Sequence, residues 1–273
     1  MALTIQASGK QQSHSRLLME VFEMESRRME QYIRSVELKR AEVPSFTEYP
    51  FNLAAIRNLE TLSFHPAVTF IVGENGSGKS TILESIAVAY GFNAEGGTKN
   101  FNFSSRATHS DLNKYIRLVK GLKRPEDGFF LRAESFYNLA TNIDKLDSEP
   151  FSGRPLINSY GGRSLHEQSH GESFFAVFQN KFRGKGIYIL DEPEAALSPS
   201  RQMSMITRIH ELVQQGSQFI IATHSPIIMA YPHARIYQVE EGFEIVKYQE
   251  TEHYQIMRAF INNTQKMLDI LME

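Results

Sequence analysis

Residues 67–81 read AVTFIVGENGSGKST, and this stretch decides the fold. Residues 67–72 form a short, continuous apolar run rich in β-branched side chains, which is typical of a strand buried on both faces. Residues 73–81 match the pattern G-x-x-x-x-G-K-[ST], and the segment STILESIAVAYGF that follows is helical in pattern. Because the loop lies between a strand and a helix, a chance glycine-rich turn is the weaker interpretation. We predict a phosphate-binding loop.

The residue types of this loop suit the phosphates of a nucleotide. Glycines let the backbone wrap with its N–H groups pointing inward at phosphate oxygens, and the helix N-terminus adds the positive end of a dipole. The lysine reaches the β and γ phosphates, and the serine hydroxyl after it can ligate Mg²⁺. The predicted nucleotide-binding residues are Gly73, Glu74, Asn75, Gly76, Ser77, Gly78, Lys79, Ser80 and Thr81, with Ser80 also a metal ligand.

Further apolar runs predict a mainly parallel sheet. GFFLRA at 128–133, GIYIL at 186–190 and QFIIAT at 218–223 are short, and each is followed at once by a polar residue. Helical patterns separate the last two runs. Buried strands alternating with helices indicate an α/β fold with helices on both faces of the sheet.

Two adjacent carboxylates follow the run at 186–190. Asp191, at the strand end, is placed to hold Mg²⁺ directly or through water. Glu192 is placed to orient or deprotonate an attacking water, a general-base role. The alternative is a solvated strand-end turn, which the phosphate loop elsewhere in the chain disfavours.

A histidine stands just past the run at 218–223. His224 could hydrogen-bond the γ-phosphate and the water, and so sense hydrolysis. A lone histidine is more often structural, but its place one helix after Glu192 favours the catalytic interpretation.

The segment SHGES at 169–173 is ambiguous by itself. It is either a turn before the helix ESFFAVFQNKF or half of an active site that a second chain completes. Its position between the phosphate loop and Asp191 favours the second interpretation.

In this order of motifs the chain resembles the ABC-class P-loop ATPases, over roughly residues 32–250. Their signature loop normally reads Leu-Ser-Gly-Gly-Gln, or ends in Glu in the SMC-like branch; here Ser169, Gly171 and Glu172 match, while His170 replaces the first glycine. The resemblance implies ATP and Mg²⁺, with Ser169 and the Gly171 N–H contacting the γ-phosphate held by the opposite subunit. It therefore implies a homodimer that closes on ATP.

Departures from the family pattern point to one branch. Ser198 stands where transporters carry the aspartate of Ala-Leu-Asp, which brings the chain closer to the small stand-alone RecF, OLD and SMC-like ATPases. No glutamine loop is obvious; Glu134 occupies that place, and we expect it to be a metal- or water-proximal residue, or else an acid near a helix N-terminus. Tyr49 and Phe51 are candidates for stacking on adenine, with core packing favoured for Phe51.

Composition excludes several classes. The chain has 273 residues, 41% of them hydrophobic, a formal net charge of −2 and no cysteine. A sizeable core is therefore expected, whereas a disulfide framework, a zinc–cysteine site and thiol catalysis are excluded. No apolar stretch approaches the ~18 residues that a membrane span needs, and no secretion signal stands out, so we expect a cytoplasmic protein.

The predicted organisation is a single ATPase domain at 32–250, with a mainly parallel central sheet and an antiparallel β subdomain. An N-terminal tail and helix precede it at 1–31, an inserted helical and irregular subdomain occupies about 92–168, and a C-terminal amphipathic helix occupies 251–273. Residues 234–248 predict an antiparallel hairpin turning at Glu241–Gly242.

The role of the ATPase is less defined. Basic residues at helical spacing suggest one helix face that could contact DNA, although a solvated face is the more economical interpretation: Lys114, Arg117, Lys120, Lys123 and Arg124. We expect an ATPase in DNA transaction or phage defence, with DNA or an effector such as a nuclease as partner. The alternatives are a transporter's nucleotide-binding subunit and a nucleotide-gated regulatory module with little turnover.

Overall fold

A computed structural model describes residues 31–99, 110–148, 155–167 and 170–273. Its six-stranded central sheet has the order β5 (Asp127–Arg132), β6 (Gly186–Asp191), β7 (Gln218–Ala222), β3 (Val68–Gly73), β8 (Arg235–Val239) and β9 (Phe243–Val246). The first five strands are parallel, and β9 returns antiparallel to β8. The α/β class and the mainly parallel sheet predicted from the sequence are confirmed.

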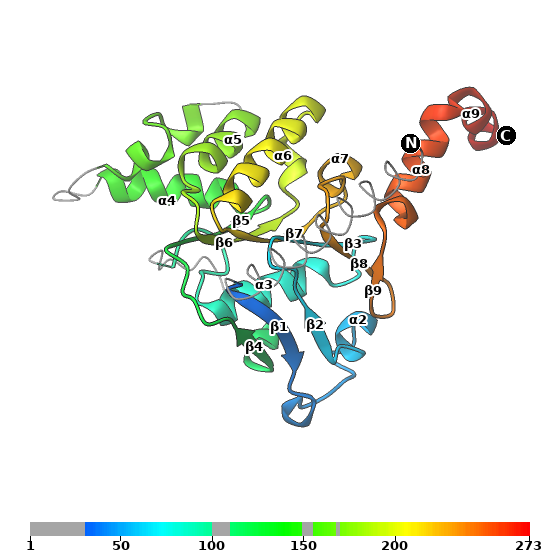
Figure 1. Ribbon diagram of the computed structural model, residues 1–273, viewed down its shortest axis with the longest axis horizontal. Helices are drawn as coiled ribbons and strands as arrows, with labels where there is room; N and C mark the ends of the chain where they lie inside the picture. Colours follow the sequence, from blue (N-terminus) through cyan, green and yellow to red (C-terminus); the bar gives the residue numbers. More distant parts are fainter. Residues whose placement is uncertain (1–30, 100–109, 149–154, 168–169) are drawn as a thin grey trace, which may run out of the picture.

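Helices cover both faces of this sheet (Figure 1). On one face lie α4 (Phe136–Ser148), α5 (His170–Asn180), α6 (Pro199–Gln214) and α7 (Pro226–Met229). On the other face α3 (Lys79–Tyr90) packs between the central sheet and a small second sheet, with α2 (Ala54–Arg57) beside it. The expected layers of an α/β fold are therefore present, with an antiparallel sheet added beyond α3.

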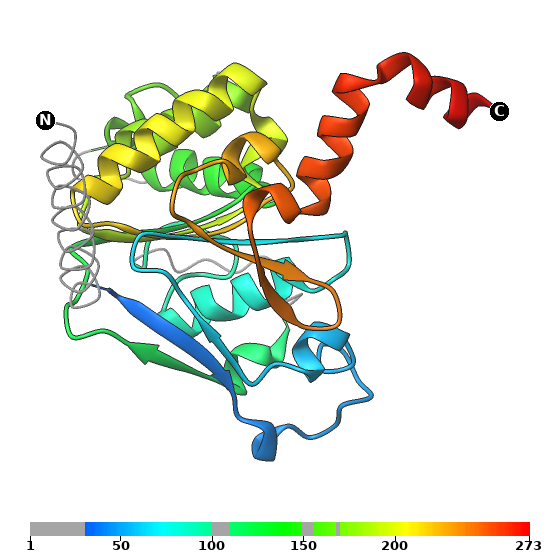
Figure 2. The same ribbon diagram turned by 45° about the vertical axis from the view of Figure 1, so that its right-hand side comes forward.

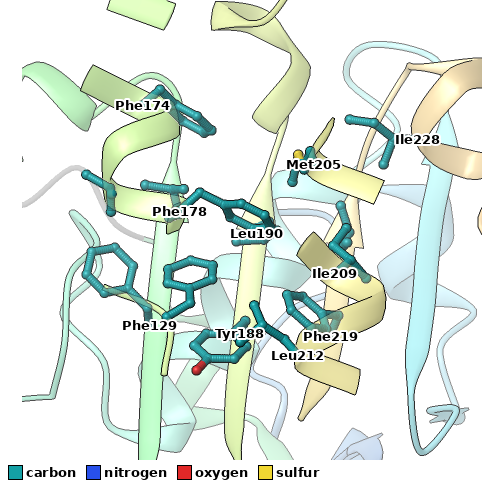
Figure 3. Close-up of a cluster of buried hydrophobic side chains, with 14 of the residues drawn as sticks. Phe129, Phe174, Phe178, Tyr188, Leu190, Met205, Ile209, Leu212, Phe219 and Ile228 are labelled. Carbon is teal, nitrogen blue, oxygen red and sulfur yellow. The ribbon is translucent and has the colours of Figure 1, made fainter. Parts of the chain in front are cut away.

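The alternation of side chains along the strands divides the core in two. On β6, Tyr188 and Leu190 join the cluster under α4–α7, while Ile187 and Ile189 join the cluster around α3. Figure 3 shows the first cluster, in which Phe178, Tyr188, Leu212 and other buried side chains fill the space between sheet and helices. Both faces of the strand are buried, which explains why its sequence is a continuous apolar run.

The antiparallel sheet has the order β2 (Thr61–Ser63), β1 (Ile33–Leu38), β4 (Ile116–Lys120). The predicted basic helix at 114–124 is wrong, because residues 116–120 form β4 and pair with β1 across about eighty residues of chain. Arg117 forms an ion pair with Glu37, Lys114 pairs with Asp111, and the Lys120 ammonium lies over the Tyr90 ring. These cations do not share a helix face.

The buried amide of Gln218, on β7, joins the two sheets. Its Oε1 accepts from the backbone N–H of Tyr32 (3.1 Å) and of Ile33 (2.9 Å), and its Nε2 donates to the carbonyls of Ile33 (2.8 Å) and His65 (3.0 Å). A single side chain thus satisfies three backbone groups where β1 begins and a fourth between β2 and β3.

The C-terminal segment is an arm of two helices rather than the single helix predicted. The arm consists of α8 (Glu252–Asn262) and α9 (Thr264–Met272), which meet at Asn263, where φ is −140° and ψ is 44°. Neither helix buries a residue, and both extend away from the body (Figure 2). The predicted hairpin is confirmed, since Val239 pairs with Phe243 across the turn. None of the helices in the described part of the chain is long and apolar enough to span a membrane.

We predict that Gln218→Met lowers the free energy of unfolding by about 2–4 kcal/mol, because buried backbone groups of β1 lose their partners while the side-chain volume is nearly kept. Chemical denaturation measures this loss. The matched control is Gln255→Met on the exposed face of α8, which should change stability by less than about 0.5 kcal/mol. Equal effects in the two variants would contradict a specific role for the Gln218 amide.

Candidate functional site

Three neighbouring strand ends define the site. β3 ends at Gly73, β6 at Asp191 and β7 at Ala222, and these strands lie side by side in the order β6-β7-β3. Parallel strands place their carboxyl ends at one edge, where the crevice outside an open α/β sheet usually binds its ligand. The phosphate loop, the acidic pair and the histidine predicted from the sequence therefore meet.

The phosphate loop has a backbone that only glycine adopts easily. Gly76 and Gly78 have φ of +80° and +101°, and α3 begins directly after them at Lys79. The first-turn N–H groups of this helix have no partner one turn earlier and so are available to an anion. The Lys79 ammonium donates to the carbonyls of Gly73 (2.9 Å) and Glu74 (2.7 Å), and burial lowers its pKa.

A cavity of about 180 Å³ opens beside this loop. Its lining includes Gly78, Lys79, Ser80, Thr81, Glu192 and the ring of Tyr49. The Tyr49 hydroxyl lies 3.2 Å from Thr81 Oγ1, and the side chain is otherwise exposed, whereas Phe51 is buried in the core as expected. Of the two aromatic candidates, Tyr49 is the one at the cavity.

Asp191 is a buried carboxylate with two partners. Ser80 Oγ donates to its Oδ1 (3.0 Å), and the Arg132 guanidinium lies 3.5 Å from its Oδ2. Burial raises the pKa of Asp191 to about 6, against the opposing effects of Arg132 and Ser80. A hydroxyl and a carboxylate held together are the hard oxygen donors that Mg²⁺ prefers, so Ser80 and Asp191 fit such an ion.

Glu134 lies close to this pair without touching it. Its exposed carboxylate contacts Arg132 at 3.3 Å, and its charge adds slightly to the upward shift of the Asp191 pKa. Arg132 also forms a closer ion pair with Glu84 at 2.7 Å. The metal-proximal role of Glu134 therefore stays a prediction.

Glu192 and His224 face each other at the mouth of the site. Glu192 takes a left-handed conformation, with φ of +50°, that turns the chain directly after Asp191. Its Oε1 lies 3.6 Å from His224 Nε2, and both side chains are half-buried. Burial lowers the pKa of His224, and the nearby Lys79 charge acts in the same direction. A neutral imidazole beside an open carboxylate suits a pair that handles the proton of a water molecule.

Sequence reasoning missed the group that holds the His224 loop. Glu194 accepts hydrogen bonds from the His224 backbone N–H and from Thr223 Oγ1 (2.7 Å), and burial raises its pKa. Arg132 was missed too, although it ends the strand next to β6 and pairs in register with Asp191. His253, which contacts His224, carries no local signal because it comes from the C-terminal arm.

The predicted signature segment lies apart from this chain's own phosphate loop. Ser169 is outside the described residues. Gly171 lies in the first turn of α5, on the opposite face of the sheet from α3 (Figure 1), and Glu172 lies 3.7 Å from Arg201. A Cβ on Gly171 would come within 2.6 Å of the Ala196 carbonyl, so this position has room only for glycine.

Comparisons with known proteins found ATPase domains and ATP-binding proteins similar to this chain. Residues 167–229 match a family described as an AAA ATPase domain, and residues 51–138 match one described as an AAA domain. The cell division ATP-binding protein FtsE of Bacillus subtilis is 20% identical over 72% of this chain and 90% of its own. A putative ABC transporter ATP-binding protein of Methanothermobacter marburgensis is 26% identical over 71% of this chain and 73% of its own. The SMC head domain of Thermotoga maritima superposes with a TM-score of 0.42 at 16% identity, over 79% of this chain and 98% of its own.

We predict that Glu194→Ala lowers the free energy of unfolding by about 1–3 kcal/mol, because the His224 N–H and the Thr223 hydroxyl lose a partner. Glu194→Gln should recover most of this, since the amide oxygen still accepts from the His224 N–H and the Thr223 hydroxyl can turn to accept. Thermal or chemical denaturation measures both variants. Wild-type stability in Glu194→Ala would show that Glu194 does not hold this loop.

Proposed function

We propose that this chain, an ABC-class P-loop ATPase domain, binds ATP at residues 73–81 and hydrolyses it to ADP and phosphate within a dimer of two copies. The resemblance seen in the sequence is confirmed at the level of this class by the family matches and the fold. The RecF, OLD and SMC-like branch stays a prediction. One observation carries the proposal: the ends of β3, β6 and β7 gather the phosphate loop, Asp191, Glu192 and His224 in one place.

Binding is assigned to the phosphate loop. The first-turn N–H groups of α3 and the Lys79 ammonium would contact the β and γ phosphates, replacing the loop's own carbonyls as partners of the lysine. Ser80 and Asp191 would hold Mg²⁺, which when bound neutralises phosphate charge. Tyr49, exposed at the edge of the cavity, is the candidate for contact with the base.

Hydrolysis is assigned to Glu192 and His224. The Glu192 carboxylate orients the attacking water and accepts its proton, a role that its half-exposed position at the cavity allows. His224 Nε2, close to the same carboxylate, hydrogen-bonds the γ-phosphate and the water. The reaction needs both groups on one side of the phosphate. The ends of β6 and β7 bring Glu192 and His224 close to each other.

The proposed dimer is supported by the position of the signature segment, which lies away from the phosphate loop of its own chain. Gly171 and the N-terminus of α5 lie across the sheet from α3, so they cannot complete the phosphate site of their own chain. They pack instead on Ala196, in the short helix that follows Glu192. A second copy would bring its Ser169, Gly171 and Glu172 to the γ-phosphate, and its α5 dipole would favour the negative charge there.

The biological setting stays a prediction. The predicted basic helix that was expected to contact DNA does not form. Arg117 and Lys120 lie in β4, and Arg117 pairs with Glu37. A nuclease or other effector as partner is an expectation from the sequence alone. The transporter-subunit alternative is favoured by one observation, the similarity to a putative ABC transporter ATP-binding protein at 26% identity.

Glu192→Gln is expected to slow ATP turnover by ~10²–10⁴, because the amide cannot accept the proton of water. Binding of a fluorescent ATP analogue should be unchanged, and an ATP-bound dimer should accumulate on size exclusion. Phosphate release measures turnover. Normal hydrolysis by this variant would remove Glu192 from its assigned role, whatever the state of the dimer.

The shared site predicts complementation between two inactive variants. Ser169→Arg should bind ATP without turning it over, and Lys79→Ala should fail to bind it. Their mixture should recover part of the activity, because a mixed dimer joins the intact phosphate loop of one chain to the intact signature of the other. Mixing is assayed at fixed total protein, with each variant alone as control. No recovery, or full activity of Ser169→Arg by itself, would contradict the composite site.

A further inference from the structure

His224 has a partner from a distant part of the chain. His253, in the first turn of α8, places its Nε2 2.9 Å from His224 Nδ1, and the two ring centroids are 5.1 Å apart. α8 is anchored here: the Thr251 hydroxyl caps its first turn, and the Tyr248 hydroxyl donates to the carbonyl of Pro226 (2.9 Å). The imidazole pair is therefore built into the junction between the arm and the site.

The contact requires one ring to donate and the other to accept. Burial lowers the pKa of both imidazoles, so both are neutral near pH 7, and a neutral ring carries one N–H. Either His224 is protonated on Nδ1 and leaves a lone pair on Nε2, or His253 donates and His224 is protonated on Nε2. The groups facing the pair include Glu192, Lys79 and Glu252.

The surroundings of His224 Nε2 distinguish the two arrangements. This atom is buried, has no hydrogen-bond partner within the described residues, and lies 3.6 Å from Glu192 Oε1. A lone pair on Nε2 would face the carboxylate oxygen and repel it. A proton on Nε2 faces that oxygen favourably, so the second arrangement has the lower energy.

We propose that His253 is a positioning residue for His224: its Nε2–H donates to His224 Nδ1 and holds His224 in the tautomer that carries its proton on Nε2, beside Glu192. This keeps a hydrogen-bond donor aimed into the site without a charged imidazole. The tautomer itself is independent of the proposed ATPase activity, whereas its effect on turnover rests on that activity.

The tautomer is read directly by ¹⁵N NMR of the full chain labelled on its nine histidines, without nucleotide. Protonated and unprotonated ring nitrogens resonate far apart, and His224→Gln identifies the signals of His224. We expect Nε2 protonated and Nδ1 unprotonated in the wild type, and a mixture of tautomers when His253 is replaced by Asn. A wild-type His224 protonated on Nδ1 would overturn the proposal even if the protein hydrolyses ATP as proposed.

Two amide substitutions separate positioning from packing. Gln at position 253 carries its amide nitrogen where histidine carries Nε2, whereas Asn carries it where histidine carries Nδ1 and so falls short of His224. We expect His253→Gln to keep kcat within about 3-fold and His253→Asn to lower it by about 10- to 100-fold, with KM for ATP unchanged in both.

Equal kcat in the Gln and Asn variants would overturn a role for the donated hydrogen bond, whether both are active or both are impaired. Binding of the fluorescent ATP analogue and the unfolding transition are recorded for both variants, so that loss of fold is not mistaken for loss of position. If the wild type shows no ATP turnover at all, the proposed function fails, and the NMR result still decides the tautomer.

Discussion

Parallel pairing of β3, β7 and β6 is the constraint from which the site follows. The register places Gly73, Ala222 and Asp191 at one edge, and each strand then delivers its next residues to the same space. The phosphate loop, the acidic pair and His224 lie far apart along the chain, yet none needs a long connecting loop to reach the others. A shift of one residue in any of these strands would turn its side chains to the other face of the sheet and dismantle the site.

The free-energy cost of burying polar groups at this edge of the sheet is offset by hydrogen bonds and ion pairs with nearby groups. Asp191 has Ser80 and Arg132, Lys79 has the loop carbonyls, and Glu194 has the His224 loop. Four of the buried polar side-chain atoms that lack a hydrogen-bond partner within the described chain also lie here, on Ser77, Arg132, His224 and His253. Unpaired buried polar atoms are rare in folded proteins, and their gathering at one edge of the sheet fits a site that binds a polar ligand.

The two parts outside the central sheet are attached to it in different ways. The antiparallel sheet shares an apolar core with α3 and the central sheet, whereas α8 and α9 bury no residue. Gln218 fastens the start of the antiparallel sheet, and the His224–His253 pair fastens the start of the C-terminal arm. Beyond that junction α8 and α9 extend away from the body (Figure 2). Ile256, Ile261 and Leu271 are exposed along them. The arm therefore meets the body beside the candidate site, where His253 contacts His224.

By itself the sequence determined those structural elements whose formation depends on residues adjacent along the chain. A continuous apolar run, three glycines and a following helical pattern are local signals, so β3, the phosphate loop and α3 could be predicted, as could the strands ending at Asp191 and Ala222. Only the tertiary structure decided which strands pair and which polar groups meet. The basic residues of 116–120 lie in a strand because β1 offers them backbone partners and Glu37 a counter-charge, and no local pattern contains that information. The contacts of Arg132, Glu194 and His253 could not be predicted for the same reason. Periodicity and turn residues can be recognised in consecutive residues, whereas a contact between distant residues depends on the whole fold.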